Sequence, residues 1–403
     1  MRRAAEERSG AGPPPGRVPR HQPPPRHPPP QARHVDRDVP SAVGEVLARL
    51  LDERLDQSAR LDPVFARDVA ACVARFTLDG GKRLRSQFLW WAMRACDGPA
   101  AAVVPALRIA AALELLQTCA LVHDDLMDGS ALRRGRPAVH TALRDRYGPG
   151  PRHEGADFGT SSAVLVGDLA LAWADDVLLD TELPPGSRER VRAEWRALRT
   201  ELVAGQYLDL HGQVTGSRSR AQALHVTRLK SALYTVERPL ALGAALAGAD
   251  EDTTRALCTA GRYAGIAFQL RDDLSGVFGD PTETGKPSGE DIREGKPTYL
   301  TAVGRARAET GGDRAALAVL DAAIGAPDLT ADDLRRVRTA LIMTGARDAV
   351  ADRADHFAAL ALRHLEAVPR SSAPEALRRL ARLLEETAHG RRAPSRARGV
   401  LPS

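Results

Sequence analysis

The sequence contains few aromatic residues and few cysteines. Only 4% of its 403 residues are Phe, Trp or Tyr. The four cysteines lie far apart and form no CxxC pair; they are Cys72, Cys96, Cys119 and Cys258. This spacing predicts neither a disulfide framework nor a zinc site, and it favours a reduced, cytoplasmic chain.

A long uncharged apolar run is also absent. The most apolar stretch, residues 106–123, is interrupted by Arg108 and Glu114, whereas a transmembrane helix needs about 20 predominantly apolar residues. We therefore expect no membrane-spanning segment. The beginning of the chain also lacks the apolar core of a signal peptide.

The chain carries little net charge once its first 40 residues are set aside. The whole sequence has a net charge of +5, and residues 1–40 contain eight arginines and four acidic residues, a balance of 8 − 4 = +4. The remainder is therefore close to neutral. Because a nucleic-acid binder depends on many contacts between clustered basic residues and phosphates, we expect no nucleic-acid partner.

Composition divides the chain into three parts. Residues 1–40 hold 11 of the 28 prolines and almost no large apolar side chains, which predicts a disordered Pro/Arg-rich leader. Residues 389–403 are basic and predict a flexible tail. Residues 41–388 are expected to form one domain.

Within that domain strand signals are absent and the periodicity is helical. Ala, Leu and Arg are abundant, and apolar residues recur every three or four positions. Breaks rich in Gly and Pro lie at residues 97–99, 147–151, 184–186, 248 and 279–281. Helices between such short breaks predict an all-α fold, a single large helical bundle.

Two aspartate pairs follow apolar helical stretches, LVHDDLMDGS at residues 121–130 and FQLRDDLSGVFGD at residues 268–280. At 100° per residue, Asp124 and Asp128 lie about 40° apart on a helix, so both carboxylates project from one face. Their mutual repulsion favours a bound cation. Clustered carboxylates favour Mg²⁺, which usually shares its coordination with substrate phosphates.

Basic residues accompany both aspartate pairs. ALRRGRPAVH at residues 131–140 follows the first pair, and Lys286 and Lys296 follow the second. Upstream, GGKRLRS at residues 80–86 combines flexible glycines with side chains that bind phosphate. It is not a Walker loop, because the GxxxxGK[ST] spacing is missing. Magnesium opposite several basic groups predicts a site for diphosphates.

Five blocks of the sequence resemble motifs of the trans-isoprenyl diphosphate synthases, the polyprenyl synthetase family. In the family's order they are GGKRLRS, LVHDDLMDGSALRRGRPAVH, GQYLDL, KSALYTVERPL and FQLRDDLSGVFGDPTETGKPSGEDIREGKPTYL. The resemblance covers roughly residues 45–385. It implies helices around a deep central cavity, usually in a homodimer. It also implies a prenyltransferase that condenses isopentenyl diphosphate head to tail with dimethylallyl, geranyl or farnesyl diphosphate.

The resemblance further implies roles for individual residues. About three Mg²⁺ ions would be bound per active site, and the metal residues would be Asp124, Asp128 and Asp272, supported by Asp125 and Asp273. Isopentenyl diphosphate would be bound by Lys82, Arg85, Gln117 and Arg134. The allylic substrate would be bound or polarised by Arg133, Lys230, Gln269, Lys286 and Lys296, with the Ser231 hydroxyl beside Lys230. Of these, the residues expected to assist catalysis are Arg133, Lys230, Gln269 and Lys286.

Three positions depart from the family pattern. Gly276 stands where many members have the third acid of the second aspartate motif, and Asp280 lies one turn further on. Asp272 and Asp273 therefore carry the predicted metal role of that motif. Ser231 replaces a common threonine and Ser86 a frequent proline, changes of little expected consequence.

Cys119 and Ala120 predict the length of the product. They lie five and four residues before Asp124, one helical turn below the predicted metal site, where the family places aromatic residues in enzymes with short products. Because both side chains are small, a stop at fifteen carbons is not expected, and geranylgeranyl diphosphate is the preferred product. Farnesyl or longer polyprenyl products remain alternatives.

Two other functions share parts of this pattern. A class I terpene cyclase has the fold, the DDxxD segment and magnesium, but it normally carries an Asn/Ser/Glu motif where this chain has DDLSGVFGD. A cyclase also has no isopentenyl diphosphate for GGKRLRS to bind. A non-catalytic regulatory subunit of a heteromeric synthase usually loses an aspartate motif, and both motifs are present here. The sequence therefore favours a synthase.

Overall fold

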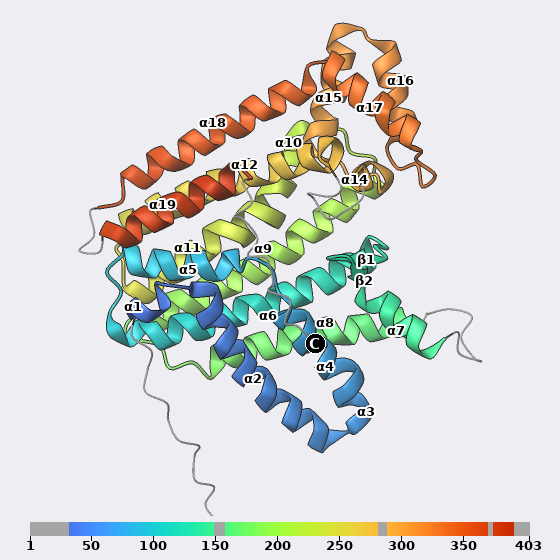
Figure 1. Cartoon of the computed structure of the whole chain (residues 1–403). Coiled ribbons are helices and arrows are strands. Elements are labelled where there is room, and N and C mark those ends of the chain that lie inside the picture. Colours follow the sequence, from blue (N-terminus) through green and yellow to red (C-terminus); the bar gives the residue numbers. More distant parts are fainter. Residues whose placement is uncertain (1–31, 149–157, 281–287, 370–373, 391–403) are drawn as a thin grey trace, which may run out of the picture.

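Helices make up almost all the regular structure in the computed structural model, which describes residues 32–148, 158–280, 288–369 and 374–390 (Figure 1). The first helices are α1 (Ala32–Val35), α2 (Val39–Leu61), α3 (Pro63–Phe65), η1 (Ala66–Ala70), α4 (Ala71–Leu78), α5 (Leu84–Ala95), η2 (Ala100–Ala102), α6 (Val103–Met127), α7 (Val139–Tyr147) and α8 (Phe158–Leu179). They are followed by α9 (Arg188–Val214), α10 (Arg220–Val226), η3 (Thr227–Glu237), α11 (Arg238–Ala247), α12 (Glu251–Phe278), α14 (Glu290–Arg293), α15 (Tyr299–Gly311), α16 (Arg314–Ala323), α17 (Ala331–Met343), α18 (Ala346–Glu366) and α19 (Pro374–Ala388). The predicted all-α fold is confirmed.

Most predicted breaks coincide with helix ends. Gly248 ends α11 in the left-handed region, with φ of 73°, a conformation that glycine adopts without steric cost. Asp250 then begins α12, because its side chain accepts a hydrogen bond from the backbone amide of Thr253. The breaks at 147–151 and 279–281 lie partly outside the described residues.

Helix α6 lies at the centre of the bundle. It packs against α8 and α5 (Figure 1), and every residue from 109 to 116 is buried. By length and composition, Ala100–Met127 could cross a membrane, yet 72% of its most apolar window is buried inside the structure. Such burial is typical of a core helix.

Helix α12 forms the second main element of the core and packs against α18, η3 and α19. Its carboxyl end and that of α6 lie on the same side of the molecule, near α10 and α14 (Figure 1). The two helices that carry the aspartate pairs thus present them to one region.

A short hairpin, which the sequence did not predict, follows α6. Strand β1 (Leu132–Arg133) pairs antiparallel with β2 (Arg136–Pro137). The turn places Arg134 and Gly135 in the left-handed region, with φ of 54° and 73°. Two-residue strands are too short to show an alternating pattern in the sequence.

The first described helix begins at Ala32, nine residues before the expected boundary at residue 41. Val35 is fully buried, and Asp36 accepts hydrogen bonds from Trp90 Nε1 at 2.9 Å and from Arg94 Nη2 at 3.0 Å. These tertiary contacts hold a segment whose composition resembles that of the leader. Residues 1–31 and 391–403, which carry the rest of the predicted leader and tail, lie outside the described residues.

Candidate active site

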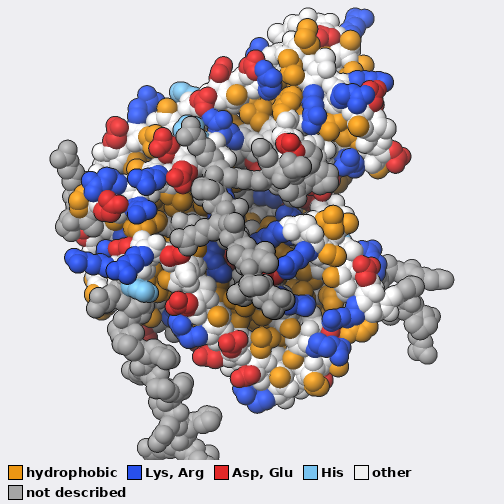
Figure 2. Space-filling view, in the orientation of Figure 1, with side chains coloured by type: hydrophobic (Ala, Val, Ile, Leu, Met, Phe, Trp, Pro, Cys, Tyr) orange, Lys and Arg blue, Asp and Glu red, His pale blue; other side chains and the backbone are white. Residues whose placement is uncertain are grey.

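A cavity of about 290 Å³ is lined by residues of α6, α9, η3 and α12. Its acidic side chains come from both aspartate pairs and from two other parts of the chain; they are Asp124, Asp209, Asp272, Asp273 and Asp291. Its basic side chains are Arg133, Lys230 and Lys296. The two aspartate pairs, far apart in the sequence, therefore share one cavity. In the view of Figure 2, Lys and Arg side chains lie among acidic and hydrophobic ones over the surface.

Asp124 lies near the end of α6 and binds groups from two other helices. Lys230 Nζ lies 3.0 Å from Asp124 Oδ1 and 2.7 Å from Asp209 Oδ2. Gln206 Nε2 donates a hydrogen bond to the same Asp124 oxygen at 3.2 Å. Burial would lower the pKa of Lys230, but the carboxylates of Asp124 and Asp209 raise it. The charged ammonium therefore compensates one of the two negative charges and is shared by both carboxylates.

Asp125 supports the cavity by holding Arg133. Its side chain is 1% exposed, and Arg133 Nε donates to Asp125 Oδ1 at 2.7 Å. Arg133 Nη2 also lies 3.6 Å from Asp124 Oδ2. Asp125 thus fixes the guanidinium next to the carboxylate of Asp124.

Asp128 ends α6 and binds Lys296. Lys296 Nζ lies 2.7 Å from Asp128 Oδ2 and 2.7 Å from Glu294 Oε2, and 3.8 Å from Asp291 Oδ1. The Asp128 side chain is 2% exposed, and its buried Oδ1 has no hydrogen-bond partner among the residues that the structure describes. A buried carboxylate oxygen of this kind is an unused acceptor.

The donor atoms around the cavity fit a hard divalent cation. They are the carboxylate oxygens of the acids that line it, and Mg²⁺ prefers such ligands. Within the described residues, however, no three His, Cys, Asp or Glu side chains converge as a ready-made metal site. Asp124 pairs with Lys230, and Asp128, which is not among the residues that line the cavity, pairs with Lys296. A metal ion at these acids would compete with the two ammonium groups.

The second aspartate pair separates into an exposed and a buried acid. Asp272 is exposed at the cavity, whereas burial raises the pKa of Asp273 to about 8. Gln269 Nε2 donates to Asp273 Oδ1 at 2.9 Å, and Ser231 Oγ donates to Gln269 Oε1 at 2.6 Å. This chain of hydrogen bonds fixes Gln269 across the cavity from Asp124. The exposed Asp272 is the better candidate for a metal ligand, and Asp273 supports Gln269.

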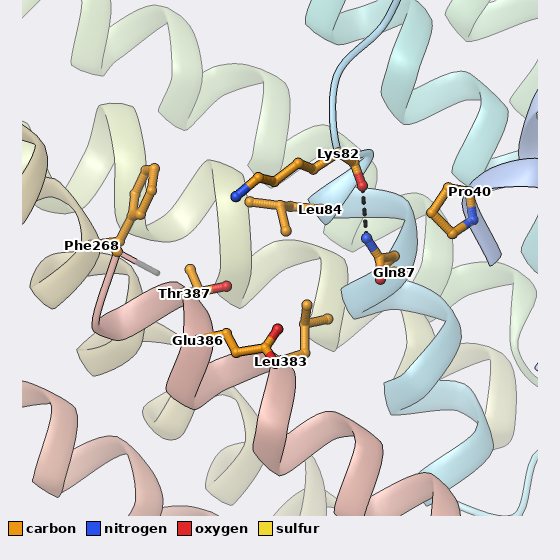
Figure 3. Close-up of a pocket in the computed structure, with 9 residues that line it drawn as sticks. Pro40, Lys82, Leu84, Gln87, Phe268, Leu383, Glu386 and Thr387 are labelled. Atoms are coloured by element: carbon orange, nitrogen blue, oxygen red, sulfur yellow. Dashed lines mark hydrogen bonds between the residues drawn. The ribbon is translucent and has the colours of Figure 1, made fainter. Parts of the chain in front are cut away.

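A second pocket, of about 280 Å³, lies between the GGKRLRS segment and α19 (Figure 3). Lys82 extends across it toward Phe268 and Thr387, and Leu84 and Gln87 line its other side. The pocket is lined by one basic side chain, Lys82, one acidic side chain, Glu386, and apolar side chains such as Leu383. Phe268 of α12 lines this pocket, and Gln269, the next residue, lines the first cavity.

The other predicted isopentenyl residues surround the start of α5. Arg85 Nη2 donates to Thr235 Oγ1 at 3.0 Å, and its guanidinium lies 4.2 Å from the ring centroid of Tyr234. Arg134 Nη1 donates to the Asp79 carbonyl at 3.0 Å, which ties the hairpin to the glycine loop. The Oε1 atom of Gln117 is buried without a hydrogen-bond partner. Lys286 lies outside the described residues.

Comparison with known proteins identifies the family. A family model described as polyprenyl synthetase matches residues 67–338. The chain belongs to the polyprenyl synthetase family. This membership confirms the predicted class, a prenyltransferase that makes prenyl diphosphates.

Individual relatives of this polyprenyl synthetase differ in their products. The chain is 35% identical over 277 residues to a geranylgeranyl diphosphate synthase of Mycobacterium tuberculosis, covering 68% of this chain and 71% of that protein. It is 32% identical over 293 residues to a geranylfarnesyl diphosphate synthase of Aeropyrum pernix, covering 72% and 84%. Among solved structures, a geranylgeranyl pyrophosphate synthase of Corynebacterium glutamicum, complexed with isoprenyl diphosphate and magnesium, matches with a TM-score of 0.79 and 37% identity, covering 87% and 98%.

Four polar residues of this polyprenyl synthetase's site were not assigned from the sequence. They are Gln206, Asp209, Asp291 and Glu294. The first two belong to the quoted block GQYLDL, and the last two belong to GEDIREGK. The motif identified their segments, but only the fold shows which side chains reach Lys230 and Lys296.

The few lysines of the chain all lie in the family's motifs. The chain has 57 Lys and Arg residues together, yet only four are lysine: Lys82, Lys230, Lys286 and Lys296. Each of the four belongs to a family block, and the three described ones line the two pockets. Lysine is a compact point charge on a flexible stem, unlike the planar fork of arginine. The site therefore uses lysine where the rest of the chain uses arginine.

Gly205 allows Lys230 to reach its partners. A Cβ at residue 205 would lie 2.7 Å from the backbone nitrogen of Lys230 and 2.9 Å from its Cα. No real Cβ tolerates such a contact with backbone, so α9 and η3 can approach only at a glycine.

We expect Gly205→Ala to destabilise the protein and to slow it. Overpacking of this kind costs about 1–3 kcal/mol, and a displaced Lys230 should lower kcat about 10-fold to 100-fold. Urea unfolding and steady-state kinetics measure the two effects. Gly311→Ala is the control, because nothing lies within 4 Å of a Cβ there. Equal stability and rate in the two variants would contradict the packing argument.

Proposed function

We propose that this polyprenyl synthetase joins isopentenyl diphosphate head to tail to an allylic diphosphate, and that its main product is geranylgeranyl diphosphate. The presence of two pockets, each lined in part by α12, carries the proposal. One holds acidic and basic side chains suited to a metal-bound diphosphate, and the other holds Lys82 and Glu386 beside apolar side chains such as Phe268 and Leu383. A reaction between two diphosphate substrates needs two such sites.

The acidic cavity suits the allylic substrate. Asp124, Asp128 and Asp272 would hold about three Mg²⁺ ions, which supply charge stabilisation for a leaving diphosphate when bound. The basic groups that would bind the diphosphate oxygens are Arg133, Lys230, Lys286 and Lys296. The allylic C–O bond breaks, its electron pair leaves with the diphosphate, and an allylic cation remains. The dipoles of Gln269 and Ser231 face this region and would stabilise the cation.

The second pocket suits isopentenyl diphosphate. By the family resemblance, its diphosphate would be held by Lys82, Arg85, Gln117 and Arg134, of which Lys82 lines this pocket. The isopentenyl double bond then attacks the allylic cation, and a new C–C bond forms. A proton leaves the adjacent carbon, with the released diphosphate as the base that accepts it. Apolar walls such as Phe268 and Leu84 exclude water, which would otherwise capture the cation.

Incubation with isopentenyl diphosphate, Mg²⁺ and each allylic primer tests this proposal. Dimethylallyl, geranyl and farnesyl diphosphate are supplied separately, and the dephosphorylated product is sized by chromatography. We expect a product of twenty carbons from each primer. No product from any primer would contradict the proposed function.

Cys119 supports the proposed product length. It is buried one turn before Asp124, and its Sγ lies 3.7 Å from Nδ1 of His123, the side chain that packs against Gly167 of α8. Ala120 beside it is equally small. Two small side chains at this level of α6 support a product longer than fifteen carbons.

We expect Cys119→Phe to shorten the main product by one or more five-carbon units. The aromatic ring would fill the path of the growing chain below Asp124. Product sizing after incubation with dimethylallyl diphosphate measures the change. Cys258→Phe is the matched control, since residue 258 lies fourteen residues before Asp272 on α12, about 21 Å along the helix. An unchanged product from Cys119→Phe would refute the role of this position.

The protein is further proposed to be a cytoplasmic homodimer. Helix α8 exposes several large apolar side chains: Phe158, Val164, Leu165 and Leu179. A row of this kind suits burial against a second copy. The four cysteines are free thiols, which is consistent with a reducing compartment. Light scattering in solution should give twice the mass of one chain, and a monomer would contradict the proposal.

A further inference from the structure

Helix α6 carries a buried acid, Glu114, that the proposed function does not use. Glu114 is 8% exposed, and its Oε1 accepts a hydrogen bond from the Ser86 hydroxyl of α5 at 2.6 Å. A distance this short is typical of a charge-assisted bond between a hydroxyl and an ionised carboxylate. Ser86 is fully buried, so water does not compete for the bond. The carboxylate is therefore held at a fixed place between α5 and α6.

Glu114 lies beneath the glycine loop GGKRLRS. A Cβ built on Gly80 would lie 3.9 Å from Glu114 Oε2. The residue before Gly80 is Asp79, whose carbonyl accepts a hydrogen bond from Arg134 Nη1 at 3.0 Å. Gln117 follows Glu114 by three residues on α6, so the two side chains are neighbours on the helix surface. The carboxylate thus lies among residues that the family resemblance assigns to isopentenyl diphosphate.

The charge of Glu114 acts on two arginines that it does not bind. Burial lowers the pKa of Arg83 and of Arg134, and the negative charge of Glu114 opposes both shifts. Within the described part of the chain, however, the Ser86 hydroxyl is the only group that donates a hydrogen bond to the Glu114 side chain. The Arg83 Nη1 and Arg85 Nε atoms are buried and have no hydrogen-bond partner among the described residues. The basic groups around the carboxylate therefore keep donors that a substrate diphosphate can use.

We propose that Ser86 and Glu114 are positioning residues for isopentenyl diphosphate. The Ser86 hydroxyl holds the carboxylate, so that Glu114 acts on Arg134 through its charge without forming an ion pair that would occupy the guanidinium. The inference rests on the proposed function, because that function supplies the isopentenyl diphosphate. Proline, which is frequent at this position in the family, has no hydroxyl and cannot make this bond. Ser86 was expected to have little consequence, because no local pattern places its side chain next to one that lies 28 residues away.

Steady-state kinetics at saturating geranyl diphosphate and Mg²⁺ tests the role of Ser86. In Ser86→Ala the carboxylate loses its hydrogen bond and should turn to the nearby arginines. We expect the KM for isopentenyl diphosphate to rise about tenfold, the loss typical of one hydrogen bond to a charged group, with kcat and the KM for geranyl diphosphate unchanged. Ser58→Ala is the matched control, because Ser58 is buried and donates to the Arg54 carbonyl of its own helix at 2.8 Å. An unchanged KM for isopentenyl diphosphate in Ser86→Ala would overturn the proposal.

Removal of the Glu114 charge separates a positioning role from a merely structural one. The double variant Ser86→Ala/Glu114→Gln has a neutral amide in place of the carboxylate, and an amide forms no ion pair with arginine. Its KM for isopentenyl diphosphate should return to within about threefold of that of the unaltered protein, because the two changes are coupled rather than additive. A structural role predicts the reverse, that the second change adds to the loss. A double variant with a KM no lower than that of Ser86→Ala would contradict the positioning role.

The outcomes separate this inference from the proposed function. If the unaltered protein makes product and Ser86→Ala has the same KM for isopentenyl diphosphate, the proposed function stands and the role of Ser86 is refuted. If the unaltered protein makes no product, the proposed function and the inference are both contradicted. Ser86→Ala removes only a hydroxyl, so we expect the variant to fold, and a thermal melt checks this.

Discussion

Replacement of Asp124 by Asn should lower kcat about 10³-fold. Asp124 is the acid at which Lys230, Gln206 and Arg133 converge, and it is the first predicted metal ligand. Loss of one carboxylate ligand removes several kcal/mol of charge stabilisation from the leaving diphosphate, and each 1.36 kcal/mol is a factor of ten in rate. Steady-state kinetics with isopentenyl and geranyl diphosphate at saturating Mg²⁺ measures the change.

The Asn side chain keeps the size of Asp124, so the fold should survive. Asp180→Asn, at an exposed acid just after α8, is the control and should leave kcat unchanged. Near-normal turnover by Asp124→Asn would refute its assignment to the metal site. If the variant also lost much of its free energy of unfolding, the fall in kcat would instead indicate a structural role.

Replacement of Lys230 by Met should lower kcat about 10²-fold to 10³-fold, the effect of removing one group that stabilises charge in the transition state. The variant also leaves Asp209 without its ammonium partner, and Asp209 is buried. An unpaired buried carboxylate costs about 1–3 kcal/mol of folding stability. Kinetics and urea unfolding measure the two effects separately.

Lys230→Arg distinguishes charge from geometry. Arginine keeps the positive charge, so the stability of the protein should change less than in Lys230→Met. Its planar fork cannot reproduce a point charge between Asp124 and Asp209, so kcat should remain well below that of the unaltered protein. Full activity in Lys230→Met would contradict a role for Lys230 at the substrate.

The sequence predicted the parts of the fold that depend on local signals. Helical periodicity and glycine breaks such as Gly248 determine where helices begin and end. The structure has helix ends at most of these predicted breaks. The sequence did not show that residues 32–38 pack against the bundle, because the contact of Asp36 with Trp90 joins residues 54 positions apart. No local pattern records such a contact.

The sequence predicted which residue types form the candidate site, but not which acidic and basic side chains pair with each other. The spacing of Asp124 and Asp128 on one helix face indicated a shared cation. It could not show that Lys230 and Lys296 neutralise them, because those pairs depend on how η3 and the segment after α14 pack.

The stoichiometry of diphosphate release tests the central claim most directly. The protein is incubated with geranyl diphosphate and Mg²⁺, with and without isopentenyl diphosphate, and the released diphosphate is counted against the isopentenyl diphosphate consumed. A head-to-tail synthase should release one diphosphate per isopentenyl unit and almost none without it. Release from geranyl diphosphate alone would indicate a cyclase, and no release under either condition would indicate a non-catalytic subunit; either result would contradict the proposed function.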